Sequence, residues 1–247
     1  MGIRYNKITE KHRREIVLLK SFPCKYGKCS FCNYIEDNSL DEKEIDSVNL
    51  EVLKEITGEY GVLEVINSGS VFELTSGTMA EIKKIVKEKN IKTLYFEIYY
   101  GYIKRLDEIR KYFEGTEIRF RMGMETFDDD FRINVYNKNF RTDEETLKLM
   151  SKELYSVCLL VCTQGQTKEM IEKDIEKGLK YFKNITINIF IDNGTKVKRD
   201  GDLVKWFVDK YSYLMNDDRV ELLIDNKDLG VFEQWWWKMR FYGFVCL

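Results

Sequence analysis

Three cysteines lie close together near the start of the chain, in the stretch Ser-Phe-Pro-Cys-Lys-Tyr-Gly-Lys-Cys-Ser-Phe-Cys that ends at Cys32. Cys24, Cys29 and Cys32 have the spacing C-x4-C-x2-C, and the only proline of the chain directly precedes the first of them. Thiolates are ligands of zinc and of iron–sulfur clusters, so the triplet predicts a metal site on a loop.

The triplet could belong to either of two kinds of metal site, a zinc site or an iron–sulfur cluster. A structural zinc ion takes four ligands, and the triplet supplies three. Cys158 and Cys162 lie in an apolar run and are predicted to be buried core, while the only histidine, His12, lies in a charged segment and is predicted to be exposed. A zinc site would therefore need a distant fourth ligand. A [4Fe–4S] cluster fits better, because three thiolates leave one iron open for a substrate or cofactor.

Six strand-like runs must position this loop, and helical patterns such as Ala80–Lys89 and Thr142–Met150 alternate with them. The second helix opens with Thr142 and Glu145 in a capping-box pattern. Strands that alternate with helices favour parallel pairing through right-handed crossovers. A seventh strand is possible at Val220–Asp225. The six runs are Ile16–Phe22, Gly61–Asn67, Lys92–Tyr99, Glu117–Glu125, Tyr155–Thr163 and Ile185–Asp192.

This alternation predicts an α/β fold, a partial (β/α)6 barrel like that of triosephosphate isomerase (a TIM-like barrel). We expect a single domain over residues 1–247, with a core at about 15–192 and a C-terminal cap at about 193–247. The chain has 247 residues and 44% hydrophobic residues, enough for a substantial core.

Period-2 alternation predicts which side chains face the inside of the barrel. In the fourth run the apolar set should meet the helices, and the polar set, with Arg119, Arg121 and Glu125, should face inward. A fully packed barrel would fill its interior with branched apolar side chains, so polar residues there predict a bound ligand. The alternative is that inward charges only pair with one another, as Arg119 or Arg121 with Glu97 would.

Residues 15–192 resemble the radical S-adenosylmethionine (SAM) superfamily in several motifs that follow the same order. Phe31 precedes the third cysteine as in that family, although the usual spacing is C-x3-C-x2-C. Asn67–Glu73 is similar to its N-S-G-S-F segment, and Glu97 stands at the glutamate of an I-E-x-x-P motif. Gly123–Asp129 is similar to G-[LV]-[EQ]-[ST]-F-D-D, and Gln164–Thr167 to a G-Q-T turn.

The resemblance implies that Cys24, Cys29 and Cys32 hold a [4Fe–4S] cluster whose open iron binds SAM. The reduced cluster would then cleave SAM to methionine and a 5′-deoxyadenosyl radical, which abstracts hydrogen from the substrate. Lys138 replaces an arginine that pairs with the SAM carboxylate, and lysine lacks the bidentate fork. The implied SAM contacts are Phe31, Asn67, Ser68, Gly69, Ser70, Glu97, Glu125, Lys138, Thr163 and Gln164.

Composition narrows the class of substrate. The formal net charge of −2 gives no field that would attract nucleic acid. No apolar run approaches the length of a membrane span, and the polar N-terminus is unlike a signal peptide. We therefore expect a cytoplasmic enzyme, where thiols stay reduced, that acts on a small molecule rather than on nucleic acid or a membrane.

Among radical SAM enzymes the chain most resembles those that cleave queuine, in its small size, its C-x4-C-x2-C loop and its N-S-G-S segment. The resemblance implies C–N bond cleavage of this 7-deazaguanine base and an external one-electron reductant such as flavodoxin or ferredoxin. The alternatives are a radical SAM enzyme for another small molecule, tRNA or peptide, and a non-enzymatic iron–sulfur or zinc protein. The expected substrate contacts are Tyr99, Asn188, Phe190, Asp192 and Asp225.

Overall fold

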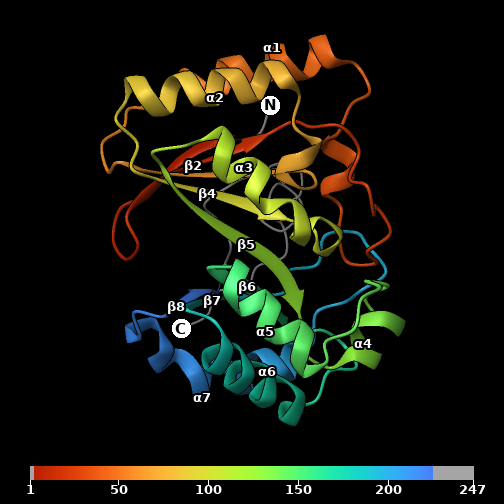
Figure 1. The fold of residues 1–247 in the computed structure, drawn as a ribbon. Helices are drawn as coiled ribbons and strands as arrows, with labels where there is room; N and C mark the ends of the chain where they lie inside the picture. The colour runs from red at the N-terminus through yellow and green to blue at the C-terminus, as the bar shows by residue number, and fades with distance from the viewer. Residues whose placement is uncertain (1–2, 225–247) are drawn as a thin grey trace, which may run out of the picture.

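The computed structural model describes residues 3–224, and within that range all strands belong to one eight-stranded sheet (Figure 1). The strands follow chain order across the sheet; β1 is antiparallel to β2, and every later pair is parallel. The strands are β1 (Tyr5–Ile8), β2 (Arg14–Leu19), β3 (Val62–Asn67), β4 (Thr93–Ile98), β5 (Glu117–Glu125), β6 (Ser156–Val161), β7 (Asn184–Ile189) and β8 (Val220–Leu223).

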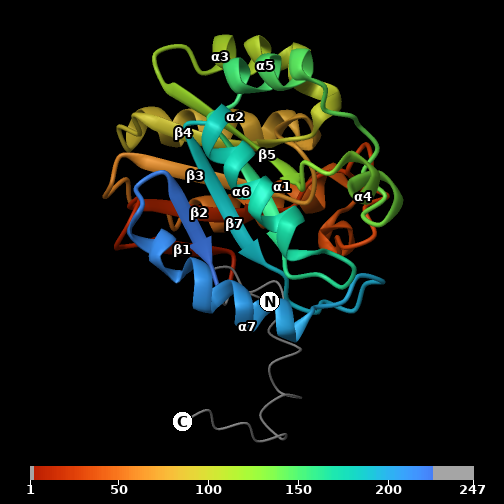
Figure 2. The ribbon, with the colours of Figure 1, turned by 90° about the horizontal axis from the view of Figure 1, so that it is seen from below.

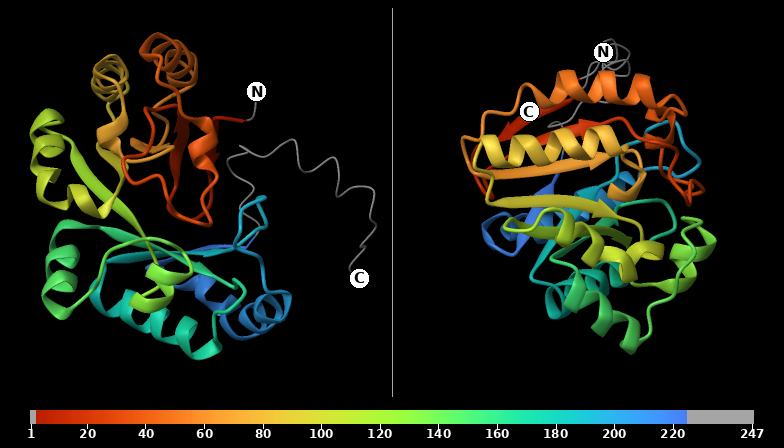
Figure 3. Two further views of the ribbon diagram at one scale, coloured as in Figure 1. Left: turned by 90° about the vertical axis from the view of Figure 1, so that its right-hand side faces the viewer. Right: turned by 45° about the horizontal axis from the view of Figure 1, so that its top comes forward.

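The sheet curves into a partial barrel, and the helices lie along its outer side (Figures 2 and 3). No helix in residues 3–224 has the length and apolar character needed to cross a membrane. The α-helices are α1 (Glu42–Leu53), α2 (Ser76–Glu88), α3 (Leu106–Tyr112), α4 (Asp129–Asn134), α5 (Glu144–Glu153), α6 (Lys168–Tyr181) and α7 (Gly201–Tyr211). Short 3-10 helices are η1 (Tyr34–Asp37), η2 (Val71–Glu73), η3 (Tyr100–Arg105) and η4 (Ser212–Asn216).

Side-chain caps fix where most of the α-helices begin. The capping oxygen accepts a hydrogen bond from a backbone N–H of the first turn, an interaction worth about 1 kcal/mol. Six helices have such a cap, at Asp41, Thr75, Asp128, Asp143, Thr167 and Asp200. The capping box predicted for α5 is wrong: Asp143 caps that helix, while the Thr142 hydroxyl donates to Asp129 at 2.8 Å.

The predicted partial barrel is confirmed. The six predicted runs correspond to β2 through β7, with ends that differ by up to three residues, and Glu117–Glu125 is reproduced without change. The sequence did not predict β1, which pairs antiparallel with β2. The seventh run is a strand too: β8 pairs with β7 and extends the sheet.

The two faces of the sheet differ as the alternation predicted. The convex face packs against the helices in one large apolar core, which includes Phe120, Met122 and Met124 of β5 and Ile185, Ile187 and Ile189 of β7. The concave face carries the polar residues of the same strands, including Arg121, Glu125 and Asn188, and these line a pocket. The site is therefore on the concave face.

Candidate active site

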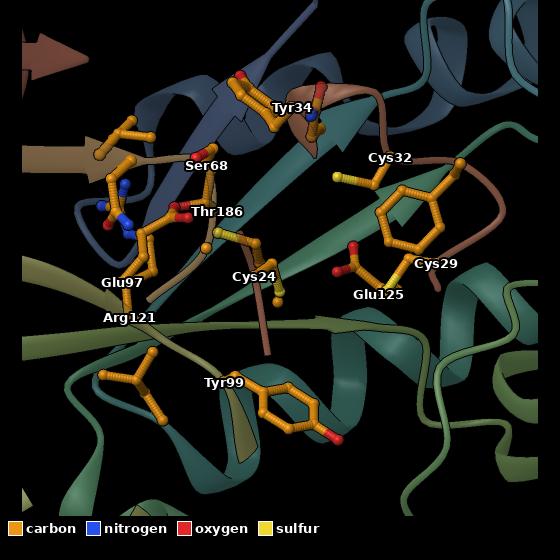
Figure 4. Close-up of a pocket in the computed structure, with 18 of the residues that line it drawn as sticks. Cys24, Cys29, Cys32, Tyr34, Ser68, Glu97, Tyr99, Arg121, Glu125 and Thr186 are labelled. Carbon is orange, nitrogen blue, oxygen red and sulfur yellow. The ribbon is translucent and has the colours of Figure 1, made fainter. Parts of the chain in front are cut away.

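The pocket of the concave face encloses about 260 Å³, close to the size of small-molecule sites, which is roughly 300–1,000 Å³. Cys24, Cys29 and Cys32 all line it (Figure 4), and Phe31 is also part of its lining. Among residues 3–224, no three histidine, cysteine or carboxylate side chains are arranged to hold one metal ion. A cluster spreads its ligands over several irons, so the cysteine arrangement suits a cluster better than a single zinc ion.

Hydrogen bonds hold the cysteine loop, residues 24–32, against the segment that follows α4. The Ser30 N–H donates to Tyr136 O at 3.0 Å, and Asn137 Nδ2 donates to Lys28 O at 2.7 Å. Gly27 has φ +58°, and a side chain there would lie 3.0 Å from Cys24 O. The loop thus needs glycine at this turn. Burial raises the pKa of the Cys29 thiol to about 12, although Lys138 opposes it.

The turn after β3, residues 67–70, lies against the first cysteine. A Cβ at Gly69 would be 3.2 Å from the Cα of Cys24, so only glycine allows this approach. The Ser68 and Ser21 hydroxyls are 2.7 Å apart. Asn67 Oδ1 is buried without a hydrogen-bond partner in the described chain, and Asn67 lines the pocket. Buried polar groups are normally paired, so this orphaned atom indicates a ligand beside the turn.

Glu125, at the end of β5, forms an ion pair with Lys138. Lys138 Nζ donates to Glu125 Oε1 at 2.7 Å, and both side chains line the pocket. Burial alone would lower the pKa of Lys138, but Glu125 outweighs it and the pKa is raised. Glu125 follows an irregularity in the strand register and has φ +64°. A Cβ at Gly123 would lie 2.2 Å from Glu125 Oε1, so glycine makes room for this pair.

A buried ion network lies deeper in the pocket; we call it the floor, and it consists of Arg14, Glu64, Arg121 and Glu221. Each arginine contacts both glutamates, with Arg121 Nη2 3.1 Å from Glu221 Oε2. All four side chains are at most 12% exposed. Because β2 and β8 are not neighbours in the sheet, the floor joins strands across the concave face.

Comparison with solved structures identifies the family. A queuine lyase from Clostridium spiroforme, solved bound to SAM and queuine, has 52% sequence identity to the chain and a TM-score of 0.87. The match covers 90% of this chain and 96% of that one. The chain belongs to the queuine lyase family. Streptococcus suis SuiB, solved bound to SAM, matches 84% of this chain and 46% of its own, with 13% identity and a TM-score of 0.48.

The chain matches no protein-family model and no curated protein. Similarity to the queuine lyase family therefore stands on the solved structure, which is similar along almost its full length.

Most residues that the sequence predicted for the site are brought together, as expected for a member of the queuine lyase family. They share the pocket with Tyr26, Tyr34 and Thr186. The predicted residues that line it are Cys24, Cys29, Phe31, Cys32, Asn67, Ser68, Gly69, Glu97, Tyr99, Glu125, Lys138 and Asn188.

Five predicted residues lie outside the lining of the pocket. Ser70 is buried at the end of the turn, and the Thr163 hydroxyl is 2.7 Å from the Tyr136 hydroxyl. Gln164 is exposed, with its N–H donating to Lys198 O at 2.8 Å. Phe190 is buried in a small apolar cluster, and exposed Asp192 accepts from the Arg199 N–H at 2.8 Å. Asp225 lies outside the described residues.

The structure also corrects two expectations and adds polar residues that the sequence did not single out. Cys158 was predicted to be core but lines the pocket, because Ser156 and Cys158 are on the concave side of β6. His12 was predicted to be exposed, yet its Nε2 is buried without a hydrogen-bond partner in the described chain. Sequence reasoning missed Arg14, Tyr34 and Glu221. For Glu221, its place between Val220 and Leu222, which face the apolar core, is a period-2 signal that could have put it on the concave face.

We predict that Glu125→Gln weakens SAM binding by roughly 10- to 100-fold, because a charge-assisted hydrogen bond is worth about 1.5–3 kcal/mol. Gln keeps the shape of the side chain, so the iron content should stay that of the wild type. Equilibrium binding of SAM to the anaerobically reconstituted protein measures the effect. Glu108→Gln, on the exposed side of α3, is the matched control. An unchanged SAM affinity would leave Glu125 as a partner of Lys138 only.

Proposed function

We propose that the chain is a queuine lyase, which cleaves the C–N bond of queuine and releases 7-aminomethyl-7-deazaguanine. The similarity to the Clostridium spiroforme queuine lyase carries this proposal. The three cysteines that line the pocket and the unpaired acceptors Asn67 and Asn188 support the proposal independently, because they provide places for a cluster, a cofactor and a polar substrate.

The residues present fit a [4Fe–4S] cluster and SAM. Cys24, Cys29 and Cys32 would ligate three irons, and Asn67 in the turn after β3 would accept a hydrogen bond from the SAM ammonium group. Lys138, already paired with Glu125, would also meet the SAM carboxylate. When bound, the reduced cluster and SAM supply a 5′-deoxyadenosyl radical that abstracts hydrogen from the substrate. The chain itself places the substrate and excludes other hydrogen donors.

Two predicted substrate contacts, Tyr99 and Asn188, line the pocket and remain our proposal for substrate binding. The ring of Tyr99 stacks on that of Tyr26, with centroids 5.2 Å apart, so the two rings form a rigid aromatic wall. Asn188 Oδ1 is buried and has no hydrogen-bond partner within residues 3–224. A flat heterocycle with N–H groups would satisfy both features.

The deciding experiment is turnover of queuine. The anaerobically reconstituted protein is incubated with SAM, a chemical reductant and free queuine, and the products are identified by mass. We expect 7-aminomethyl-7-deazaguanine and 5′-deoxyadenosine, both of which should require SAM and reductant. Formation of 5′-deoxyadenosine with all of the queuine intact would show a radical SAM enzyme that has another substrate, and would overturn the proposal.

We further propose that an external one-electron donor such as flavodoxin or ferredoxin reduces the cluster, and that the enzyme works in the cytoplasm. Five cysteines of the described chain are free thiols, which supports a reducing compartment. Replacing the chemical reductant with flavodoxin and its reductase should sustain queuine cleavage. No turnover with flavodoxin and its reductase, in a protein that does turn over with the chemical reductant, would count against this donor.

A further inference from the structure

Glu97 is the carboxyl group of the pocket that has no partner. Its side chain lies on the concave side of β4, whereas its neighbours Phe96 and Ile98 belong to the apolar core. Within residues 3–224, no hydrogen bond or ion pair joins Glu97 to another side chain. Burial raises the pKa of Glu97 to about 7, although Arg121 opposes the shift. A carboxyl group enclosed in this way is normally matched by a cation or a donor.

The cations near Glu97 are already matched to other carboxylates. Arg121 donates from Nε to Ser156 and from its two terminal nitrogens to the glutamates of the floor. Lys138 donates to Glu125. Glu97 is therefore the surplus anion among three cations and four carboxylates, which are Arg14, Arg121, Lys138, Glu64, Glu97, Glu125 and Glu221.

Glu97 also lies away from the end of the pocket where the cluster is expected. It is in register with Arg121 of β5, and Arg121 precedes Glu125 by four residues, a separation of roughly 13 Å along an extended strand. Figure 4 shows Glu97 beside Arg121, while Cys29, Cys32 and Glu125 gather on the other side of the view. The methionine end of SAM is expected at the cluster. Glu97 therefore faces the part of the pocket that is farther from the cluster, where the substrate is expected.

A second unpaired acceptor lies on another wall of the same pocket. Asn188 Oδ1, on the concave side of β7, is buried without a partner in the described chain. The Thr186 hydroxyl next to it on that side donates to Glu221 at 3.3 Å, so it is occupied. A pocket with unpaired acceptors predicts a ligand that brings donors, above all a cationic one.

We propose that Glu97 binds the cationic amine of the substrate, with Asn188 as a second acceptor, and that Glu97 does not hold SAM. This inference rests on the proposed function, since queuine carries a secondary amine on its aminomethyl arm that is protonated near neutral pH. An ammonium group at Glu97 offsets the cost of burying the carboxylate and makes a charge-assisted hydrogen bond. Glu97 then determines specificity for 7-deazaguanines that carry an amine.

The test is direct binding to the reconstituted, SAM-loaded protein without reductant. Dissociation constants are measured for queuine and for 7-methyl-7-deazaguanine, which lacks the amine, with the wild type and with Glu97→Gln. We expect Glu97→Gln to weaken queuine binding on the order of 10²-fold, as for a buried charge pair that loses one partner. Binding of the methyl base, SAM affinity and iron content should stay at wild-type values.

Glu108→Gln on the surface is the matched control and should leave all of these quantities unchanged. Loss of SAM affinity in Glu97→Gln would assign Glu97 to the cofactor and overturn the inference. Equal affinity of wild type and Glu97→Gln for queuine, in an enzyme that does cleave queuine, would overturn the inference alone. A wild-type enzyme that neither binds nor cleaves queuine would overturn the proposed function as well.

Discussion

Alanine at any one of Cys24, Cys29 or Cys32 is expected to reduce 5′-deoxyadenosine formation to the level of an assay without enzyme. Each cysteine lines the pocket, and no other cysteine of the described chain lies on that loop. A cluster that loses one of three thiolates is incomplete, so the iron content should also fall well below four per chain. Iron and sulfide analysis and chromatography of 5′-deoxyadenosine measure the two effects.

Cys158→Ala is the matched control for these variants. Cys158 lines the same pocket but comes from β6, beside Gly123 of β5 rather than on the cysteine loop. We expect Cys158→Ala to keep the full iron content and to keep SAM cleavage. A Cys24→Ala variant with four irons and normal turnover would mean that Cys24, which precedes the longer first gap of C-x4-C-x2-C, is not a ligand of the cluster.

Local sequence signals were enough to predict much of the fold and the part of the pocket formed by the cysteine loop and the turn after β3. The cysteine spacing and Gly27 lie within one short stretch of sequence, and Gly69 lies within another. The period-2 alternation of β5 placed Arg121 and Glu125 on the concave face correctly. Cys158 was misplaced because Val157 and the three residues after Cys158, Leu159 to Val161, are apolar, so that the alternation is hidden there.

Contacts between distant strands could not be predicted. One alternative from the sequence was that Arg119 or Arg121 pairs with Glu97, but Arg119 contacts Glu117, and Arg121 contacts Glu64 and Glu221. Which side chains meet across the concave face depends on how far the sheet curls, and no local pattern encodes that. The same holds for Arg14, which reaches Glu221 from the other end of the chain.

The second large effect that we expect is a loss of stability when the ion network of the floor is disrupted. Arg121→Met keeps much of the side-chain volume but leaves Glu64 and Glu221 with Arg14 as their only cation in the floor. Removing one partner of a buried ion pair typically costs about 3–5 kcal/mol. We expect a loss of that size in the free energy of unfolding at pH 7, measured by urea unfolding of the iron-free chain with circular dichroism. Arg105→Met, which breaks an exposed pair with Glu108, should change it little.

The pH dependence of this loss distinguishes the ion network from packing. Burial by itself raises the pKa of Glu221, but Arg121 and Arg14 outweigh it and lower the pKa to about 2. The folded pKa is then below the unfolded value of about 4.3, so the stabilisation is complete above that value and is lost as pH falls toward 2. The difference between wild type and Arg121→Met should therefore shrink over that range.

A compensating variant separates the charge from the side chain. Arg121→Met combined with Glu221→Gln leaves Arg14 and Glu64 as a balanced pair, so we expect about 1–3 kcal/mol of the loss to be recovered at pH 7. If the double variant is instead as unstable as the sum of the two single variants, the floor stabilises the barrel through packing of its side chains. In that case the four charges would not act as one network across the concave face.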